Sequence, residues 1–206
     1  SSEFHDKDKH MAGTLKRRET MAKILAVRGN ALVVTGLGST TYDAFATADS
    51  PLTFYLWGAM GAAAMIGLGL ANAQPQRRVL VVTGDGEMLM GLGSLATIGA
   101  ARTVNLSIAV IDNEHYAETG MQQSHTARGV DLAGIAQAAG FARASTVRTS
   151  AELDAAIPNL FSQPGPVFTA IKVVAEPAAI ALPPRDGPYL RSRFRAALLG
   201  EAHAVE

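Results

Sequence analysis

The chain alternates between short apolar runs and longer segments in which apolar residues recur with helical spacing. Residues 15–27 show this spacing, and the charged residues 16–19 within them are expected to face water. Continuous apolar strands separated by helices predict an α/β fold, a parallel β-sheet with helices on both faces. The expected strands are 31–34, 52–57, 78–82, 106–111, 143–147 and 167–174, and the expected helices are 15–27, 39–48, 58–73, 87–101, 131–139, 150–161 and 189–199.

Two segments lie outside this alternation. Residues 1–11 are polar and charged and end at Met11, and we interpret them as an expression remnant. Prolines become frequent after Glu176, so we interpret residues 176–206 as a C-terminal surface arm. Residues 12–175 are expected to form one α/β domain.

Composition narrows the class of protein. The 18 basic and 18 acidic residues balance, so no overall charge favours nucleic acid or an acidic membrane surface. The absence of cysteine excludes a disulfide scaffold, a thiolate zinc site and a cysteine nucleophile. The longest apolar stretch, 58–73, is glycine-rich and short for a bilayer. We therefore expect a cytoplasmic protein with neither a nucleic-acid nor a membrane partner.

The candidate chemistry lies in turns that follow expected strands, where parallel sheets bind their ligands. Gly84-Asp85-Gly86 sets a carboxylate between two glycines, where we expect it to be exposed and the backbone to approach a ligand closely. The helix that follows offers N–H groups to an anion. Asn113 follows the next strand, so its side chain is expected at the same rim of the sheet as Asp85.

A carboxylate beside a phosphate repels it unless a cation lies between them. Magnesium prefers carboxylate, amide and phosphate oxygens, so Asp85 with Asn113 indicates a divalent cation bound to a diphosphate. The alternative, a simple glycine turn with Asn113 as a turn former, stays open for the tripeptide alone.

These residues resemble the thiamine diphosphate motif, GDG followed by Asn. Residues 52–141 resemble the small, or β, subunit of sulfopyruvate and phosphonopyruvate decarboxylases, and weaker similarity extends over 15–194. The resemblance implies the diphosphate-binding (PP-module) fold. It also implies a two-chain enzyme that decarboxylates a small anionic 2-oxo acid and releases CO2 and an aldehyde. The segments that carry it are Gly58-Ala59-Met60-Gly61, residues 67–71, residues 84–100, Thr119-Gly120 and His125-Thr126.

The resemblance also implies roles for single positions. Asp85, the Asn113 side chain and the His115 carbonyl would bind Mg²⁺. Ser39 and Gly86 would contact the diphosphate of thiamine diphosphate. The full set of expected cofactor-binding residues is Ser39, Gly58, Met60, Gly84, Asp85, Gly86, Glu87, Asn113 and His115.

Within that set, the Gly58 carbonyl would accept a hydrogen bond from the aminopyrimidine, and Met60 would be the apolar wedge that bends the cofactor. Core packing is the alternative role for Met60. Glu87 departs from the family, in which a small residue often follows GDG. Because a carboxylate near a diphosphate is unfavourable, we expect Glu87 to face solvent in the first helical turn.

His125 is the candidate catalytic residue, as a proton shuttle or a partner for an anionic substrate. A solvated loop histidine is the alternative. The polar residues around it are candidates for hydrogen bonds to substrate. They are Gln122, Gln123, Ser124 and Thr126.

The chain resembles only the diphosphate half of such enzymes. The glutamate that activates the ring is therefore expected from a separate pyrimidine-binding α subunit in a hetero-oligomer. Two alternatives keep the cofactor: a carboligase subunit of the acetolactate synthase type, and a non-catalytic partner subunit. A third is nicotinamide dinucleotide binding, because residues 36–38 and 91–93 partly match a glycine-rich fingerprint, although no acidic residue follows at the next strand end.

Overall fold

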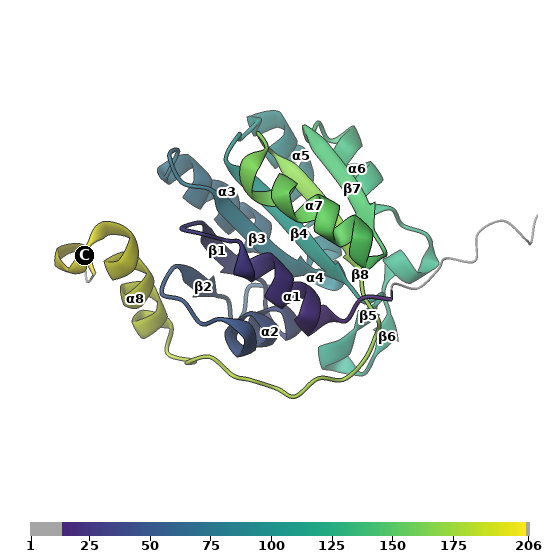
Figure 1. The fold of residues 1–206 in the computed structure, drawn as a ribbon, viewed down its shortest axis with the longest axis horizontal. Helices are drawn as coiled ribbons and strands as arrows, with labels where there is room; N and C mark the ends of the chain where they lie inside the picture. Colours follow the sequence, from purple (N-terminus) through teal and green to yellow (C-terminus); the bar gives the residue numbers. More distant parts are fainter. Residues whose placement is uncertain (1–13, 205–206) are drawn as a thin grey trace, which may run out of the picture.

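A six-stranded parallel β-sheet lies between two layers of helices in the computed structural model, which describes residues 14–204 (Figure 1). The strand order is β2-β1-β3-β4-β8-β7. The predicted α/β fold is confirmed, whereas the interpretation of residues 1–11 lies outside the described residues. The strands are β1 Leu32–Thr35, β2 Thr53–Tyr55, β3 Val79–Gly84, β4 Leu106–Asp112, β7 Arg143–Val147 and β8 Val167–Lys172. The helices are α1 Arg17–Ala26, α2 Ser39–Thr47, α3 Ala63–Ala73, α4 Asp85–Met90, α5 Ser94–Ala101, α6 Leu132–Ala138, α7 Ser150–Ser162 and α8 Gly187–Leu199.

The sheet is buried on both faces. Helices α1, α2 and α7 cover one face, and α3, α5 and α6 cover the other (Figure 1). Along β3, Val79 and Val81 pack into one layer while Leu80 and Val82 pack into the other, because successive side chains point to opposite faces. This double burial is why the strands are continuous apolar runs in the sequence.

The chain changes direction across the sheet between β1 and β3. Strand β1 pairs with β2 on one side and with β3 on the other. The loops that leave the carboxyl ends of β1 and β3 therefore diverge, and such a switch point is where open parallel sheets form a crevice for ligands. The loops concerned are residues 36–38 and 84–86.

Two predicted helices differ from those observed. The helix expected over 58–73 begins at Ala63, because Ala59 and Gly61 have φ angles of 55° and 93°. The helix expected over 87–101 is two helices, α4 and α5, separated at residues 91–93. A Cβ on Gly91 would lie 2.2 Å from the Gly61 carbonyl oxygen. The break between α4 and α5 therefore leaves room for the turn of residues 58–62 to pack against Gly91. Residues 91–93 join two helices and do not follow a strand, which disfavours a dinucleotide-binding turn there.

A short antiparallel hairpin follows β4 and has no counterpart among the predicted elements. It consists of β5 (His115–Tyr116) and β6 (Gln122–Gln123), and the 3₁₀ turn His125–Arg128 comes directly after it. This hairpin carries several of the expected site residues.

The C-terminal segment runs along the molecule from β8 to α8, which lies beside the edge strand β2 (Figure 1). Leu190 and Phe194 of α8 are buried, and the Phe194 ring lies 5.7 Å from that of Phe54. The segment expected to be a surface arm therefore contributes to the core through α8, which also covers the edge strand β2. Within residues 14–204, no helix has the length and apolar character needed to cross a membrane.

Candidate functional site

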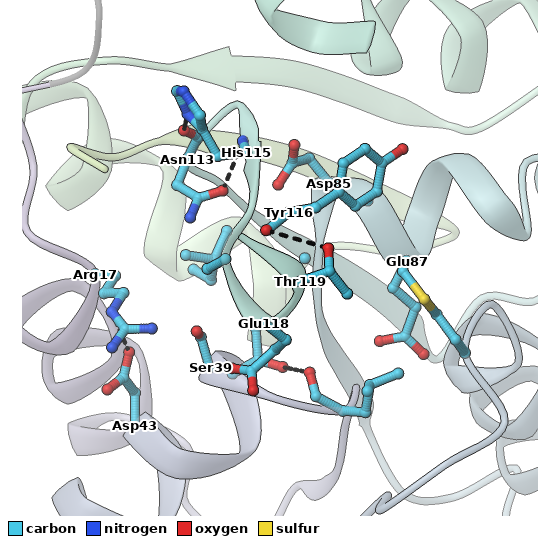
Figure 2. A pocket seen from close by; sticks show the side chains of 17 residues that line it. Arg17, Ser39, Asp43, Asp85, Glu87, Asn113, His115, Tyr116, Glu118 and Thr119 are labelled. Carbon is cyan, nitrogen blue, oxygen red and sulfur yellow. Dashed lines mark hydrogen bonds and ion pairs between the residues drawn. The ribbon is translucent and has the colours of Figure 1, made fainter. Parts of the chain in front are cut away.

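A pocket of about 150 Å³ opens at the carboxyl ends of β1, β3 and β4, at the switch point of the sheet (Figure 2). Every expected cofactor-binding residue except Gly58 lines it. Gly58 is exposed on the turn before α3, and His125 is exposed beyond the hairpin, so neither borders this pocket. The lining residues are Arg17, Leu37, Ser39, Thr40, Asp43, Met60, Gly84, Asp85, Gly86, Glu87, Ile111, Asn113, His115, Tyr116, Ala117, Glu118 and Thr119.

Asp85 is buried, contrary to the expectation of an exposed carboxylate. It is only 2% exposed, and its Oδ2 accepts a hydrogen bond from Ser124 Oγ at 2.5 Å and contacts Thr126 Oγ1 at 3.4 Å. Burial and the nearby charge of Asp112 raise the pKa of Asp85 to about 6, although the two hydroxyls favour its charged form. Ser124 and Thr126, which were candidates for substrate contacts, are thus buried supports of this carboxylate.

A second buried carboxylate, Asp112, lies at the end of β4 and is fully engaged. Asp112 Oδ2 lies 2.8 Å from Lys172 Nζ, and Thr126 Oγ1 donates a 2.8 Å hydrogen bond to Asp112 Oδ1. Lys172 Nζ also lies 2.7 Å from Glu114 Oε1. Burial alone would lower the pKa of Lys172, but its bonds to Asp112 and Glu114 outweigh burial and raise it. The ammonium group is therefore shared between Asp112 and Glu114, and Asp85 has no basic partner among these residues.

The turn after β4 holds Asn113 and His115 in a fixed relationship. Asn113 Oδ1 accepts a 3.0 Å hydrogen bond from the His115 backbone N–H, and His115 Nδ1 lies 2.8 Å from the Asn113 carbonyl oxygen. Glu114 between them has a φ of 64°, a left-handed conformation that is costly for a residue with a side chain. Its ion pair with Lys172 holds the turn in that conformation.

Glu87 points inward, so the expectation that it faces solvent is wrong. It is 5% exposed; Thr83 Oγ1 donates to its Oε2 at 2.9 Å, and the Gly61 N–H donates to its Oε1 at 3.4 Å. Burial raises the pKa of Glu87, against hydrogen bonds from Thr83 and from backbone N–H groups. A Cβ on Gly36 would lie 1.8 Å from Glu87 Oε2, so the carboxylate fills space that only a glycine leaves open. Glu87 thereby links the turns after β1 and before α3.

Sequence reasoning missed part of the pocket wall. Arg17, expected to face water, is 8% exposed and ion-paired with Asp43. Tyr116 packs on Gly86, where a Cβ would lie 2.4 Å from the tyrosine ring. Glu118 and Thr119, from the same hairpin segment, also line the pocket, as their place in the loop after the β4 strand suggests. For Arg17, the sequence offers only the apolar positions of α1, which identify the buried face of that helix. They do not reveal that a charged residue in its first turn reaches a pocket.

The chemistry of this wall suits an anionic ligand held through a cation. No group of three or more His, Asp or Glu side chains able to hold a metal occurs within residues 14–204. A cation beside Asp85 would therefore need amide, carbonyl and ligand oxygens to complete its coordination, a set that hard divalent cations accept.

Comparison with known proteins identifies the class. Residues 36–171, from the end of β1 almost to the end of β8, match the family described as thiamine pyrophosphate enzyme, C-terminal TPP binding domain. The chain is also 37% identical to the beta subunit of sulfopyruvate decarboxylase from Methanothermobacter thermautotrophicus, over 87% of this chain and 94% of that subunit. The chain thus belongs to the thiamine pyrophosphate enzyme family and, within it, to the family of sulfopyruvate decarboxylase beta subunits. The resemblance seen in the sequence is confirmed.

Other relatives match over part of their length. Phosphonopyruvate decarboxylase from Streptomyces viridochromogenes is 37% identical over 70% of this chain, which spans 36% of that protein. Among solved structures, an enzyme from Mycobacterium smegmatis assigned as thiamin diphosphate-dependent superposes with a TM-score of 0.68 at 21% identity. The match covers 81% of this chain and 34% of that one. It supports the fold alone, and about two thirds of that chain lies outside the matched region.

Proposed function

We propose that this chain is the diphosphate-binding subunit of a two-chain, thiamine diphosphate-dependent decarboxylase that acts on a small anionic 2-oxo acid. The observation that carries the proposal is that one pocket at the switch point is lined by Ser39, Met60, Asp85 and Asn113 together. When bound, thiamine diphosphate supplies the nucleophilic carbon and the electron sink that make loss of CO2 possible. The chain's own residues hold and orient that group.

Magnesium is part of the proposal. Asp85, the Asn113 side chain and the His115 carbonyl are the ligands we propose, together with diphosphate oxygens. Both hydroxyl contacts of Asp85 go to Oδ2, so Oδ1 is the oxygen we assign to the cation. A divalent cation there would offset a buried carboxylate whose charged form is disfavoured by burial and by the charge of Asp112.

The remaining roles concern the organic part of the cofactor and the substrate. Met60 is 40% exposed at the pocket wall, which fits a wedge that contacts a ligand better than a core position does. Ser39 and Gly86 lie at the starts of helices, where backbone N–H groups can donate hydrogen bonds to phosphate oxygens. Gly58 and His125 lie outside the pocket, so their contacts to the pyrimidine and to substrate would form only in the assembled enzyme.

A partner subunit completes the proposal. Each acidic side chain that lines the pocket already has a partner within this chain: Asp85 binds Ser124, Glu87 binds Thr83, Asp43 binds arginines, and Glu118 is hydrogen-bonded to Tyr42. This supports a pyrimidine-binding α subunit as the source of the activating glutamate. We also propose a cytoplasmic location, as expected from the composition of the chain.

Reconstitution with the α subunit tests the function. The mixed chains are expected to release CO2 from sulfopyruvate, phosphonopyruvate or a simpler 2-oxo acid, whereas neither chain alone does so. Formation of an acetolactate-type product in place of an aldehyde would assign a carboligase subunit. This alternative draws on a 28% identity to an acetolactate synthase large subunit of Escherichia coli. Full activity of this chain by itself would refute the split site.

A further inference from the structure

Arg17 is a buried arginine in the pocket wall to which no role is yet attached. It is 8% exposed, and its Nε lies 3.3 Å from Asp43 Oδ2. That Nε makes no hydrogen bond to any residue in the described part of the chain. The ion pair with Asp43 therefore lacks hydrogen-bond geometry, and a buried guanidinium group, which carries five N–H donors, favours a further oxyanion beside it.

The charges around Asp43 do not balance. Asp43 Oδ1 accepts a 2.9 Å hydrogen bond from Arg18 Nε, so one carboxylate faces two guanidinium groups. Burial raises the pKa of Asp43, while Arg17 and Arg18 favour its charged form. With the carboxylate ionised, this cluster carries one excess positive charge. Arg17 borders the pocket, whereas Arg18 does not and bonds instead to the carbonyl of Ala179.

The start of α2 meets the same part of the pocket. Ser39 and Thr40 line it, and the first turn of α2 contains no acidic residue. Gly38, the residue before the helix, has no side chain to cap the N–H groups, and the exposed Glu118 carboxylate lies beside it, with Oε1 3.2 Å from where a Cβ on Gly38 would be. Figure 2 shows Arg17 and Asp43 together beside Ser39. A helix N-terminus and a guanidinium that face one space both favour an anion there.

We propose that Arg17 binds the terminal phosphate of the cofactor, as a direct anchor that complements the cation at Asp85 and Asn113. This inference rests on the proposed function. Ser39 and Thr40, which line the pocket with Arg17, favour the diphosphate as the source of the oxyanion that Arg17 binds. The anionic tail of the substrate offers the same chemistry, and the experiment below separates the two.

The experiment compares Arg17→Gln with Arg18→Gln in the complex with the α subunit. Both substitutions remove one arginine from Asp43, but only the first removes a group from the pocket. Affinities for thiamine diphosphate and thiamine monophosphate are measured calorimetrically at saturating Mg²⁺, and the ³¹P resonances of the bound diphosphate are recorded. Arg17→Gln is expected to weaken diphosphate binding about ten-fold, with a smaller effect on the monophosphate and a shifted terminal-phosphate resonance. Arg18→Gln is expected to leave the ratio of the two affinities unchanged.

Each contrary result has a defined meaning. Equal effects of the two substitutions would overturn the inference, because they would reflect the Asp43 cluster alone. An unchanged affinity with a raised KM for the 2-oxo acid would also overturn it and assign Arg17 to the substrate tail. A wild-type complex that binds no thiamine diphosphate would refute the proposed function itself. If Arg17→Gln does not fold, Arg17→Lys is measured in its place, and it is expected to retain charge but lose part of the affinity.

Discussion

Ser124 Oγ lies 2.5 Å from Asp85 Oδ2 and thereby joins the loop after β4 to the turn after β3. Thr126 extends the link to Asp112, which is bound to Lys172. The carboxylate of the GDG turn is therefore held in place by the segment that also supplies Asn113. This arrangement pre-organises one oxygen donor before any ligand arrives and explains why a buried carboxylate is tolerated at a strand end.

Asp85→Ala is expected to abolish Mg²⁺-dependent binding of thiamine diphosphate in the assembled complex. Loss of a supporting residue behind a metal ligand typically costs 10- to 100-fold in affinity, so loss of the ligand itself is expected to exceed about 100-fold. Folding is expected to survive, because the Ser124 and Thr126 hydroxyls lie 2.9 Å apart and can bond to each other. Titration calorimetry with and without EDTA measures the effect.

Asp154→Ala is the matched control for this experiment. Asp154 is a surface carboxylate, 59% exposed in its side chain and paired with Lys23 on the outer helices. It is expected to leave cofactor affinity unchanged. An Asp85→Ala complex that retains wild-type affinity would exclude the proposed cation site.

Met60→Ala is expected to reduce turnover by up to about 100-fold while leaving stability within about 0.5 kcal/mol. The reason is that an apolar wedge aligns the cofactor, whereas its removal from a partly exposed position costs little packing. Met65→Ala provides the control, since Met65 is equally exposed at 40% but lies on α3 outside the pocket. Equal turnover in the two variants would assign Met60 a packing role only.

Gly36 and Glu87 are expected to be energetically coupled. Gly36→Ala sets a methyl group against the Glu87 carboxylate and is expected to destabilise the chain by about 1–3 kcal/mol. In a Glu87→Ala background the same change is expected to cost less, because the carboxylate oxygen 1.8 Å from the added carbon is gone, while the Thr83 hydroxyl at 2.8 Å stays. Urea unfolding of the four chains in this double-mutant cycle measures the coupling. Strict additivity would show that Glu87 does not fill the space that Gly36 leaves.

The sheet was predictable because its strands are buried on both faces and appear as apolar runs in the sequence. The GDG turn and Asn113 were predictable as neighbours for a related reason: parallel strands bring their carboxyl ends to one rim. The helix break at Gly91 was not predictable, because it depends on contact with Gly61 from a distant segment. Backbone contacts between glycines leave no pattern in either segment.

The directions of charged side chains were the least predictable part of the site. Glu87 was expected in solvent and Arg17 on a hydrated face, but both are buried. Each is accommodated by a tertiary partner, Thr83 for the glutamate and Asp43 for the arginine. Sequence periodicity assigns a residue to a face of a helix, yet it does not reveal whether a loop from elsewhere covers that face.

Tyr55 makes the stability of the chain sensitive to alkaline pH. It is 1% exposed and donates a 2.9 Å hydrogen bond to Asp49 Oδ1. Burial and the charge of Asp49 raise the pKa of Tyr55 well above its ordinary value of 10. The stability that this shift contributes is complete below pH 10, where the phenol is neutral in the folded and unfolded chain alike. Above that pH only the unfolded chain loses the proton, so stability falls as pH rises.

Tyr55→Phe is expected to remove this component of the pH dependence. Between about pH 9.5 and 11 the free energy of unfolding of wild type is expected to fall more steeply than that of the variant, by up to about 1.4 kcal/mol per pH unit. At neutral pH the variant is expected to be about 1 kcal/mol less stable, since it lacks the bond to Asp49. Urea unfolding at successive pH values gives both quantities. Tyr189→Phe is the control, because Tyr189 is 50% exposed, and parallel curves for wild type and Tyr55→Phe would refute the assignment.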